Sequence, residues 1–107
     1  MEFQKIIDRA IEIRKQYEAK EIQIYGSAWT SEEVALGFVG DVGDLVKLIV
    51  AENGKRSIAN SKEKLAHELA DCLWSVIVLA HLHGISLENS FTHTMNGLEK
   101  HLSENQS

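Results

Sequence analysis

The sequence predicts an all-α protein of four helices arranged as a bundle. Proline is absent from the 107 residues and aromatic residues make up 7%, which disfavours a sandwich or barrel full of turns. Apolar residues recur at helical spacing in four segments. Short connections separate these segments, and helices joined in this way usually pack as antiparallel neighbours.

The first helix is predicted over residues 2–19. Apolar residues at helical spacing alternate there with lysine, glutamate and arginine, as in an amphipathic surface helix. Residues 20–29 are ambiguous and could form an ordered loop. The apolar positions of the helix are Phe3, Ile6, Ile7, Ala10, Ile13 and Tyr17.

The second helix is predicted over residues 31–52. Thr30 has the features of an N-cap, and Glu33 completes a capping box three residues later. Asn53-Gly54 ends the helix. Three glycines in its interior, each costing about 1 kcal/mol relative to alanine, mark a smooth stripe that another helix or a ligand could approach. These glycines are Gly37, Gly40 and Gly43.

The third helix is predicted over residues 61–83, with Asn60 or Ser61 as its cap. The fourth is predicted over residues 86–102. No repeat, linker or change of composition divides the chain, so residues 1–107 are expected to form one domain.

An acidic residue, Asp71, interrupts the most apolar run of the chain, residues 69–80. We expect its carboxylate to be nearly buried, and burying an unpaired ion costs several kcal/mol. A cationic side chain, a raised pKa or a metal ion must therefore compensate. Glu68, three residues earlier, lies on the same helical face.

A second acidic pair, Asp41 and Asp44, lies in the preceding helix. If the two helices are antiparallel and both pairs face one seam, four acids converge, and several must protonate unless a cation is present. Oxygen ligands without paired Cys or His favour Mg²⁺ or Mn²⁺ over zinc. The alternative is a solvated face, which is the usual setting of a single acidic i,i+3 pair.

Composition excludes several classes of function. The net charge is −5 and no basic run is present, so nucleic-acid binding is not expected. The run from Leu69 to Ile85 carries polar residues and is expected to be too short and too polar to span a membrane. The single cysteine, Cys72, and an N-terminus without signal-peptide features predict a core thiol in a reducing, cytoplasmic setting.

Two segments together resemble a known family. Residues 38–45, FVGDVGDL, and residues 67–73, HELADCL, resemble the paired signature of the MazG-like nucleoside triphosphate pyrophosphohydrolases, an all-α superfamily with the pattern E-E-x-x-E followed by E-x-x-D. The nearest branch is that of the dCTP pyrophosphatases, which read G-E-V-G-E-L at the first half. This chain has aspartate at both glutamate positions of that half, whereas Glu68 and Asp71 match the second half unchanged.

The resemblance implies a four-helix protomer that forms a homodimer or homotetramer. It also implies Mg²⁺-dependent hydrolysis, with Mn²⁺ as a possible substitute, of a nucleoside triphosphate to the monophosphate and pyrophosphate, in a house-cleaning role. Asp41, Asp44, Glu68 and Asp71 would be the metal ligands and catalytic residues. In the last helix Thr94, Asn96 and Leu98 stand where related enzymes often carry a lysine, an acid and an asparagine.

Four further residues are candidates for substrate binding, each with an alternative. Trp29 could stack on a base or cap one end of the bundle. Lys55 and Arg56 could hold phosphates or remain solvated in their loop. Lys47 could reach a phosphate or pair with a nearby acid.

Two other classes of function compete with the enzyme. The first is a catalytically silent helical module that binds nucleotides or a protein partner without turnover. The second is a purely structural oligomerisation bundle, in which the acids would pair tightly with lysine or arginine and no cation would bind.

Overall fold

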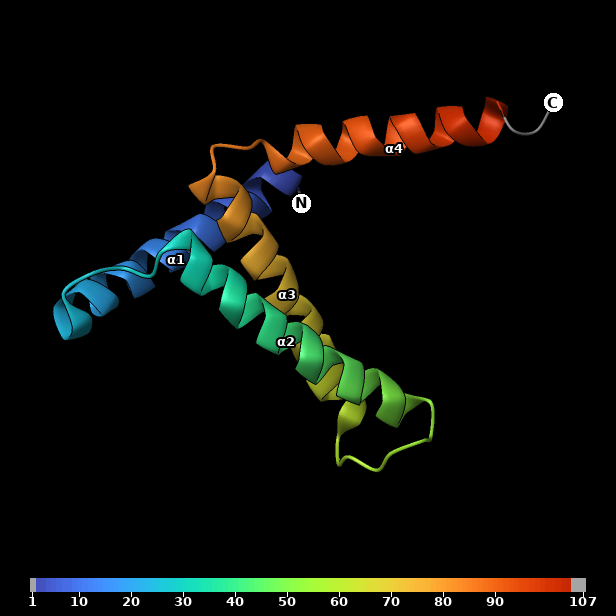
Figure 1. Cartoon of the computed structure of the whole chain (residues 1–107), viewed down its shortest axis with the longest axis horizontal. Coiled ribbons are helices and arrows are strands. Elements are labelled where there is room, and N and C mark those ends of the chain that lie inside the picture. Colours follow the sequence, from blue (N-terminus) through green and yellow to red (C-terminus); the bar gives the residue numbers. More distant parts are fainter. Residues whose placement is uncertain (1, 105–107) are drawn as a thin grey trace.

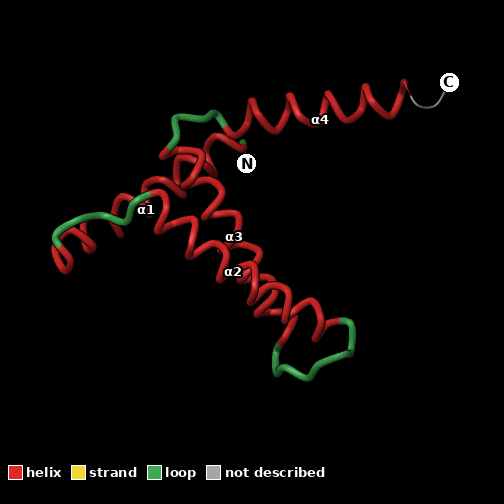
Figure 2. The backbone as a smooth tube through the Cα atoms, in the orientation of Figure 1, coloured by secondary structure: helices red, strands yellow, loops and turns green. Residues whose placement is uncertain are grey.

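The computed structural model describes residues 2–104 and contains four α-helices (Figures 1 and 2). They are α1 (Phe3–Tyr25), α2 (Ser31–Glu52), α3 (Ser61–Leu82) and α4 (Leu87–Glu104). Within the described residues no strand is present. The prediction of an all-α fold with four helices is therefore confirmed.

The helices α2 and α3 form an antiparallel hairpin that is the centre of the molecule, and α1 packs on α3 (Figure 1). The core is small and draws on all three helices. One hydrogen bond ties α1 to α3, because the indole Nε1 of Trp74 donates to the carbonyl oxygen of Ala10 at 3.0 Å. The ring of Tyr17 lies 5.6 Å from that of Trp74. The buried apolar residues are Ile7, Val34, Leu48, Ile77 and Val78.

The start of α2 is fixed by the predicted capping box. The backbone N–H of Glu33 donates to Thr30 Oγ1 at 3.2 Å, and the backbone N–H of Thr30 donates to Glu33 Oε1 at 3.1 Å. Two N–H groups that a helix start leaves without partners are satisfied in this way. The register of the acidic residues on α2 is set from this fixed point.

The first helix is longer than predicted. It continues through residues 20–25, which the apolar pattern left ambiguous, and ends at Gly26. Gly26 has φ of 85° and its N–H donates to the carbonyl oxygen of Ile22 at 2.9 Å, a left-handed helix end that favours glycine. Glu21, on the added length of the helix, forms a buried ion pair with Arg14. The bounds of the other helices agree with the predictions to within about two residues.

The fourth helix extends away from the other three (Figure 1), and none of its described residues is buried. The radius of gyration is 17.3 Å, whereas a compact domain of this length has about 13 Å. The exposed apolar residues of α4 follow one helical face. They are Phe91, Met95, Leu98 and Leu102.

A second exposed apolar surface lies on α2. Leu36, Val39 and Val46 are more than half exposed, and a Cβ built at Gly40 or Gly43 would meet no atom within 4 Å. Among the described residues no close approach to the glycine stripe is seen, because a Cβ added at Gly37 would be at an ordinary contact distance of 3.8 Å from the ring of Trp29.

Among the described residues, α3 alone is long and apolar enough to cross a membrane, judged by length and composition. This test concerns the whole helix, Ser61–Leu82, whereas the expectation concerned the run from Leu69 to Ile85. The core helix of a soluble protein passes the same test, so the finding is weak evidence. In this protein α3 packs against both α1 and α2 and carries Glu68 and Asp71.

Replacing Ile77 with alanine should test the small core. The residue is 3% exposed, so Ile77→Ala should lower the free energy of unfolding by about 2–5 kcal/mol through lost burial and a cavity. Ile24, on α1, is 68% exposed, and Ile24→Ala should change it by about 0.5 kcal/mol or less. Urea denaturation at one protein concentration measures both; equal losses would contradict the observed core.

Candidate functional site

Three carboxylates converge in the seam between α2 and α3. Asp41 and Asp44 lie one turn apart on α2, and Glu68 faces them from α3. One carboxylate oxygen from each residue can be chosen so that all three lie within 4.8 Å of one another. The antiparallel hairpin produces this convergence, because it brings the face of α2 that carries Asp41 and Asp44 opposite Glu68 on α3.

The three acids differ in burial. Asp41 and Glu68 are half-buried and Asp44 is exposed. The Oε2 atom of Glu68 is buried and has no hydrogen-bond partner. A buried acceptor without a partner costs free energy, and here two further carboxylates lie beside it, so either a proton or a cation would stabilise this oxygen.

Burial raises the pKa of Asp41, and the charges of Asp71 and Asp44 raise it further, against a lowering effect of His67. Burial also raises the pKa of Glu68, and the charges of the three aspartates add to this effect. The pKa of the Cys72 thiol is raised by burial and by nearby acids, which is consistent with a core thiol. The field in the seam is therefore strongly negative, and it favours either protons or a cation.

Asp71 is less buried than predicted. Its side chain is 35% exposed and its neighbours Leu69 and Leu73 are 52% and 50% exposed, because they face neither α1 nor α2. The Nε2 atom of His67 lies 3.1 Å from Asp71 Oδ2. Asp71 also lies outside the group of three carboxylates that converge, although its charge acts on Asp41 and Glu68.

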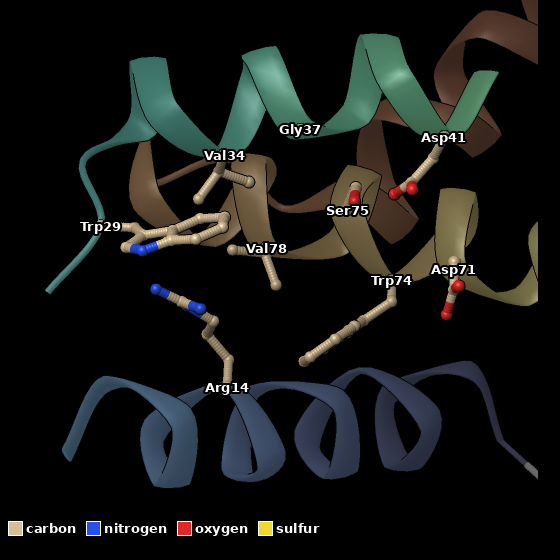
Figure 3. A pocket seen from close by; sticks show the side chains of 9 residues that line it. All are labelled: Arg14, Trp29, Val34, Gly37, Asp41, Asp71, Trp74, Ser75 and Val78. Carbon is tan, nitrogen blue, oxygen red and sulfur yellow. The ribbon is translucent and has the colours of Figure 1, made fainter. Parts of the chain in front are cut away.

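A cavity of about 210 Å³ adjoins the acids. Figure 3 shows Asp41 and Asp71 at one end and Trp29 and Arg14 at the other. The wall thus combines a flat aromatic ring, a cation and two carboxylates, which is a mixture suited to a ligand with a ring and a charged group. The remaining lining residues are Val34, Gly37, Trp74, Ser75 and Val78.

The other candidate substrate residues differ in position. Trp29 lines the cavity, whereas Lys47, Lys55 and Arg56 are exposed and do not line it. Lys55 and Arg56 follow the end of α2 at Glu52, which is about 12 Å along the helix axis from Asp44. Contact between these three cations and a substrate stays a prediction.

Arg14 and Glu21 were not identified from the sequence. Their spacing could have identified them. Residues 7, 14 and 21 are seven positions apart and therefore share the core-facing side of α1. A charged pair placed on that side must be buried and paired, and both residues are buried here.

The family described as the MazG nucleotide pyrophosphohydrolase domain matches residues 29–102. The chain belongs to the MazG family. The match includes α2, α3, all four acids and most of α4, whereas α1 with Arg14 and Glu21 lies before it. No curated protein and no solved structure matches the chain.

The residues of this MazG domain fit a hard divalent cation. The donors are three carboxylates without Cys or His among them, which suits Mg²⁺ or Mn²⁺. The buried Oε2 of Glu68 lacks a partner, and one exposed acid leaves the site open to solvent. Asp41, Asp44 and Glu68 would hold the ion, with Asp71 beside them.

The raised pKa values predict how the stability of the metal-free protein depends on pH. An acid whose folded pKa is raised binds more protons in the folded state, so its contribution to stability falls as pH rises from the ordinary carboxyl pKa of about 4 through the raised pKa of the folded state. The double variant Asp41→Asn with Glu68→Gln should lose less stability than the wild type over this range. Thermal melts in EDTA at several pH values measure the difference.

Added Mg²⁺ should raise the melting temperature of the wild type at neutral pH, because it binds the folded state, and should not affect the double variant. Glu21 has a lowered pKa, since hydrogen bonds from Arg14 and Trp29 outweigh the effect of burial, but this contribution is common to both chains and cancels. Glu12→Gln, an exposed acid on α1, is the control and should behave as the wild type. Identical pH curves for wild type and double variant would contradict convergence of the acids.

Proposed function

We propose that this MazG domain is a Mg²⁺-dependent nucleoside triphosphate pyrophosphohydrolase that converts a (d)NTP into the (d)NMP and pyrophosphate. One observation carries the proposal: Asp41, Asp44 and Glu68 converge beside a cavity that Trp29 and Asp71 line. A cation bound by the carboxylates and a flat ring at the far end match the two ends of a nucleotide. A house-cleaning role in the cytoplasm follows as part of the proposal.

The bound cation would supply charge neutralisation at the phosphates and a more acidic water. The protein side chains would position the cation, the base and the attacking water. Asp41, Asp44 and Glu68 would hold the cation at one end of the site, and Trp29 would receive the base at the other. Asp71, whose Oδ2 lies 3.1 Å from His67 Nε2 and which lines the cavity, would accept a proton from a water that attacks the α-phosphorus.

The proposed step is hydrolysis of the anhydride bond between the α- and β-phosphates. The water oxygen bonds to the α-phosphorus, the bond to the bridging oxygen breaks, and pyrophosphate leaves. A general base contributes typically 10²–10⁴-fold to such a step. We therefore expect Asp71→Asn, which removes this carboxylate, to lower kcat by about 10²–10⁴-fold.

A panel of ribo- and deoxyribonucleoside triphosphates with MgCl₂, run in H₂¹⁸O, tests the proposal. The expected products are monophosphate carrying the label and unlabelled pyrophosphate. Glu68→Gln should reduce turnover by at least about 10²-fold, because it removes a carboxylate from the cation site. Glu63→Gln, an exposed acid in the first turn of the same helix, is the matched control and should keep full activity.

Other products would contradict the proposal in distinct ways. Diphosphate and inorganic phosphate would mean cleavage at a different bond. Binding of nucleotides without any product would favour the catalytically silent module instead.

We further propose that the protein works as a homodimer or homotetramer. The described residues include no large side chain that is less than 2% exposed, and apolar faces of α2 and α4 lie open. A second copy that covers these faces would complete the core that one protomer lacks.

Light scattering at micromolar concentration should therefore give the mass of a dimer or tetramer. Phe91→Asp with Leu98→Asp, on the apolar face of α4, should shift the mass toward the monomer, since two buried charges are costly. His93→Asp with Asn96→Asp places two acids on the other face of α4 and should keep the oligomer. A monomeric wild type at this concentration would contradict the proposal.

A further inference from the structure

The linker between α1 and α2 is tied back to α1 by a buried carboxylate. Glu21 accepts hydrogen bonds from the two terminal nitrogens of Arg14 at 2.9 and 2.7 Å and from the backbone N–H of Trp29 at 2.8 Å. Arg14 and Glu21 are 7% and 9% exposed, whereas Trp29 is 46% exposed. A bidentate guanidinium–carboxylate pair has one preferred geometry, so Trp29 is anchored to a fixed point.

The anchored residues border the cavity that leads to the acids. Arg14 and Trp29 lie at the end opposite Asp41 and Asp71 (Figure 3). On the α2 side, the ring lies against Gly37, where an added Cβ would be at an ordinary contact distance of 3.8 Å from it. The ring thus has a defined place, although almost half of the residue is exposed to solvent.

We propose that Glu21 is a positioning residue for nucleotide recognition, which holds Trp29 so that the indole forms a preformed wall for the nucleobase. The inference rests on the proposed function. Glu21 need not touch the substrate, because its effect passes through the backbone of Trp29. Ordering a side chain on binding costs about 0.5–1.5 kcal/mol, and a wall that is already ordered avoids this cost.

Two double variants separate the tether from the ion pair. Arg14→Met with Glu21→Leu removes both charges and the acceptor of the Trp29 N–H. Arg14→Met with Glu21→Gln also removes both charges but keeps an amide oxygen as acceptor. Replacing both members of a buried ion pair avoids leaving one charge unpaired, so both variants should fold, and their circular dichroism and melting temperature check this.

Glu18→Gln is the matched control. Glu18 lies on the same helix and 3.7 Å from Arg14 Nε, but it makes no hydrogen bond to Trp29. The probes are the α,β-imido analogues of the four deoxynucleoside triphosphates with Mg²⁺, measured by calorimetry. A second readout that needs no nucleotide is ¹⁹F NMR of 5-fluorotryptophan, assigned by Trp29→Phe.

The variant Arg14→Met with Glu21→Leu (the Leu variant) should bind its best analogue about two- to tenfold more weakly than the wild type, which corresponds to the ordering cost of one side chain. Its Trp29 resonance should move toward that of the free amino acid. The variant Arg14→Met with Glu21→Gln (the Gln variant) should restore most of both properties, and Glu18→Gln should match the wild type. This pattern would support the tether.

Three results would overturn the inference, and they can be told apart. A wild type that binds none of the four deoxynucleotide analogues and none of their ribonucleotide counterparts would overturn the proposed function and the positioning role together. A wild type that binds, with Leu and Gln variants of equal affinity, would overturn only the positioning role. A Leu variant that lacks helical circular dichroism would show that the pair is needed for folding, and would overturn the role as well.

Discussion

Repulsion among three carboxylates in the α2–α3 seam is the interaction that the packing of this hairpin must overcome. Asp41, Asp44 and Glu68 place oxygen atoms within 4.8 Å of one another, and burial and mutual charge raise the pKa of Asp41 and Glu68. Apolar packing of α2 on α3 must hold these groups together against their charge. A protein that is stable only by a small margin retains such an arrangement at a cost, which a bound cation would relieve.

The remaining features are arranged around this seam. The capping box at Thr30 sets where α2 starts, and the hydrogen bond from Trp74 to Ala10 brings α1 against α3. The cavity lies between α1 and the hairpin, with its acidic end in the seam and its aromatic end at Trp29 (Figure 3). The α2–α3 hairpin carries the carboxylates. The opposite end of the cavity is lined by Arg14 of α1 and by Trp29 of the linker between α1 and α2.

Much of this could be predicted from local patterns. Capping residues and apolar spacing located α2 and α3, and the two acidic pairs on them predicted a shared seam. The prediction for α1 stopped early because the core-facing position of its continuation is Glu21, a charged residue paired with Arg14, and the apolar pattern gives no signal there. The burial of Asp71 was overestimated, since apolar neighbours in sequence need not be covered by another element. Leu69 and Leu73 are apolar and yet half exposed.

The placement of α4 is the part that a sequence pattern could not provide. Its apolar face was evident, but which surface covers that face depends on tertiary and quaternary contacts, which spacing along one chain does not encode. The same holds for Lys47, Lys55 and Arg56, whose side chains are exposed in the protomer. Membership of the MazG family indicates the class of reaction.

Mn²⁺ titration followed by electron paramagnetic resonance tests the central claim most directly, because it counts ions at the seam without substrate. We expect one tightly bound ion per protomer in the wild type, displaced by excess Mg²⁺, and its loss in Glu68→Gln with retained helicity. Binding should persist in Glu63→Gln. No bound Mn²⁺ in the wild type, or equal binding in Glu68→Gln, would contradict the claim that the three carboxylates form a cation site.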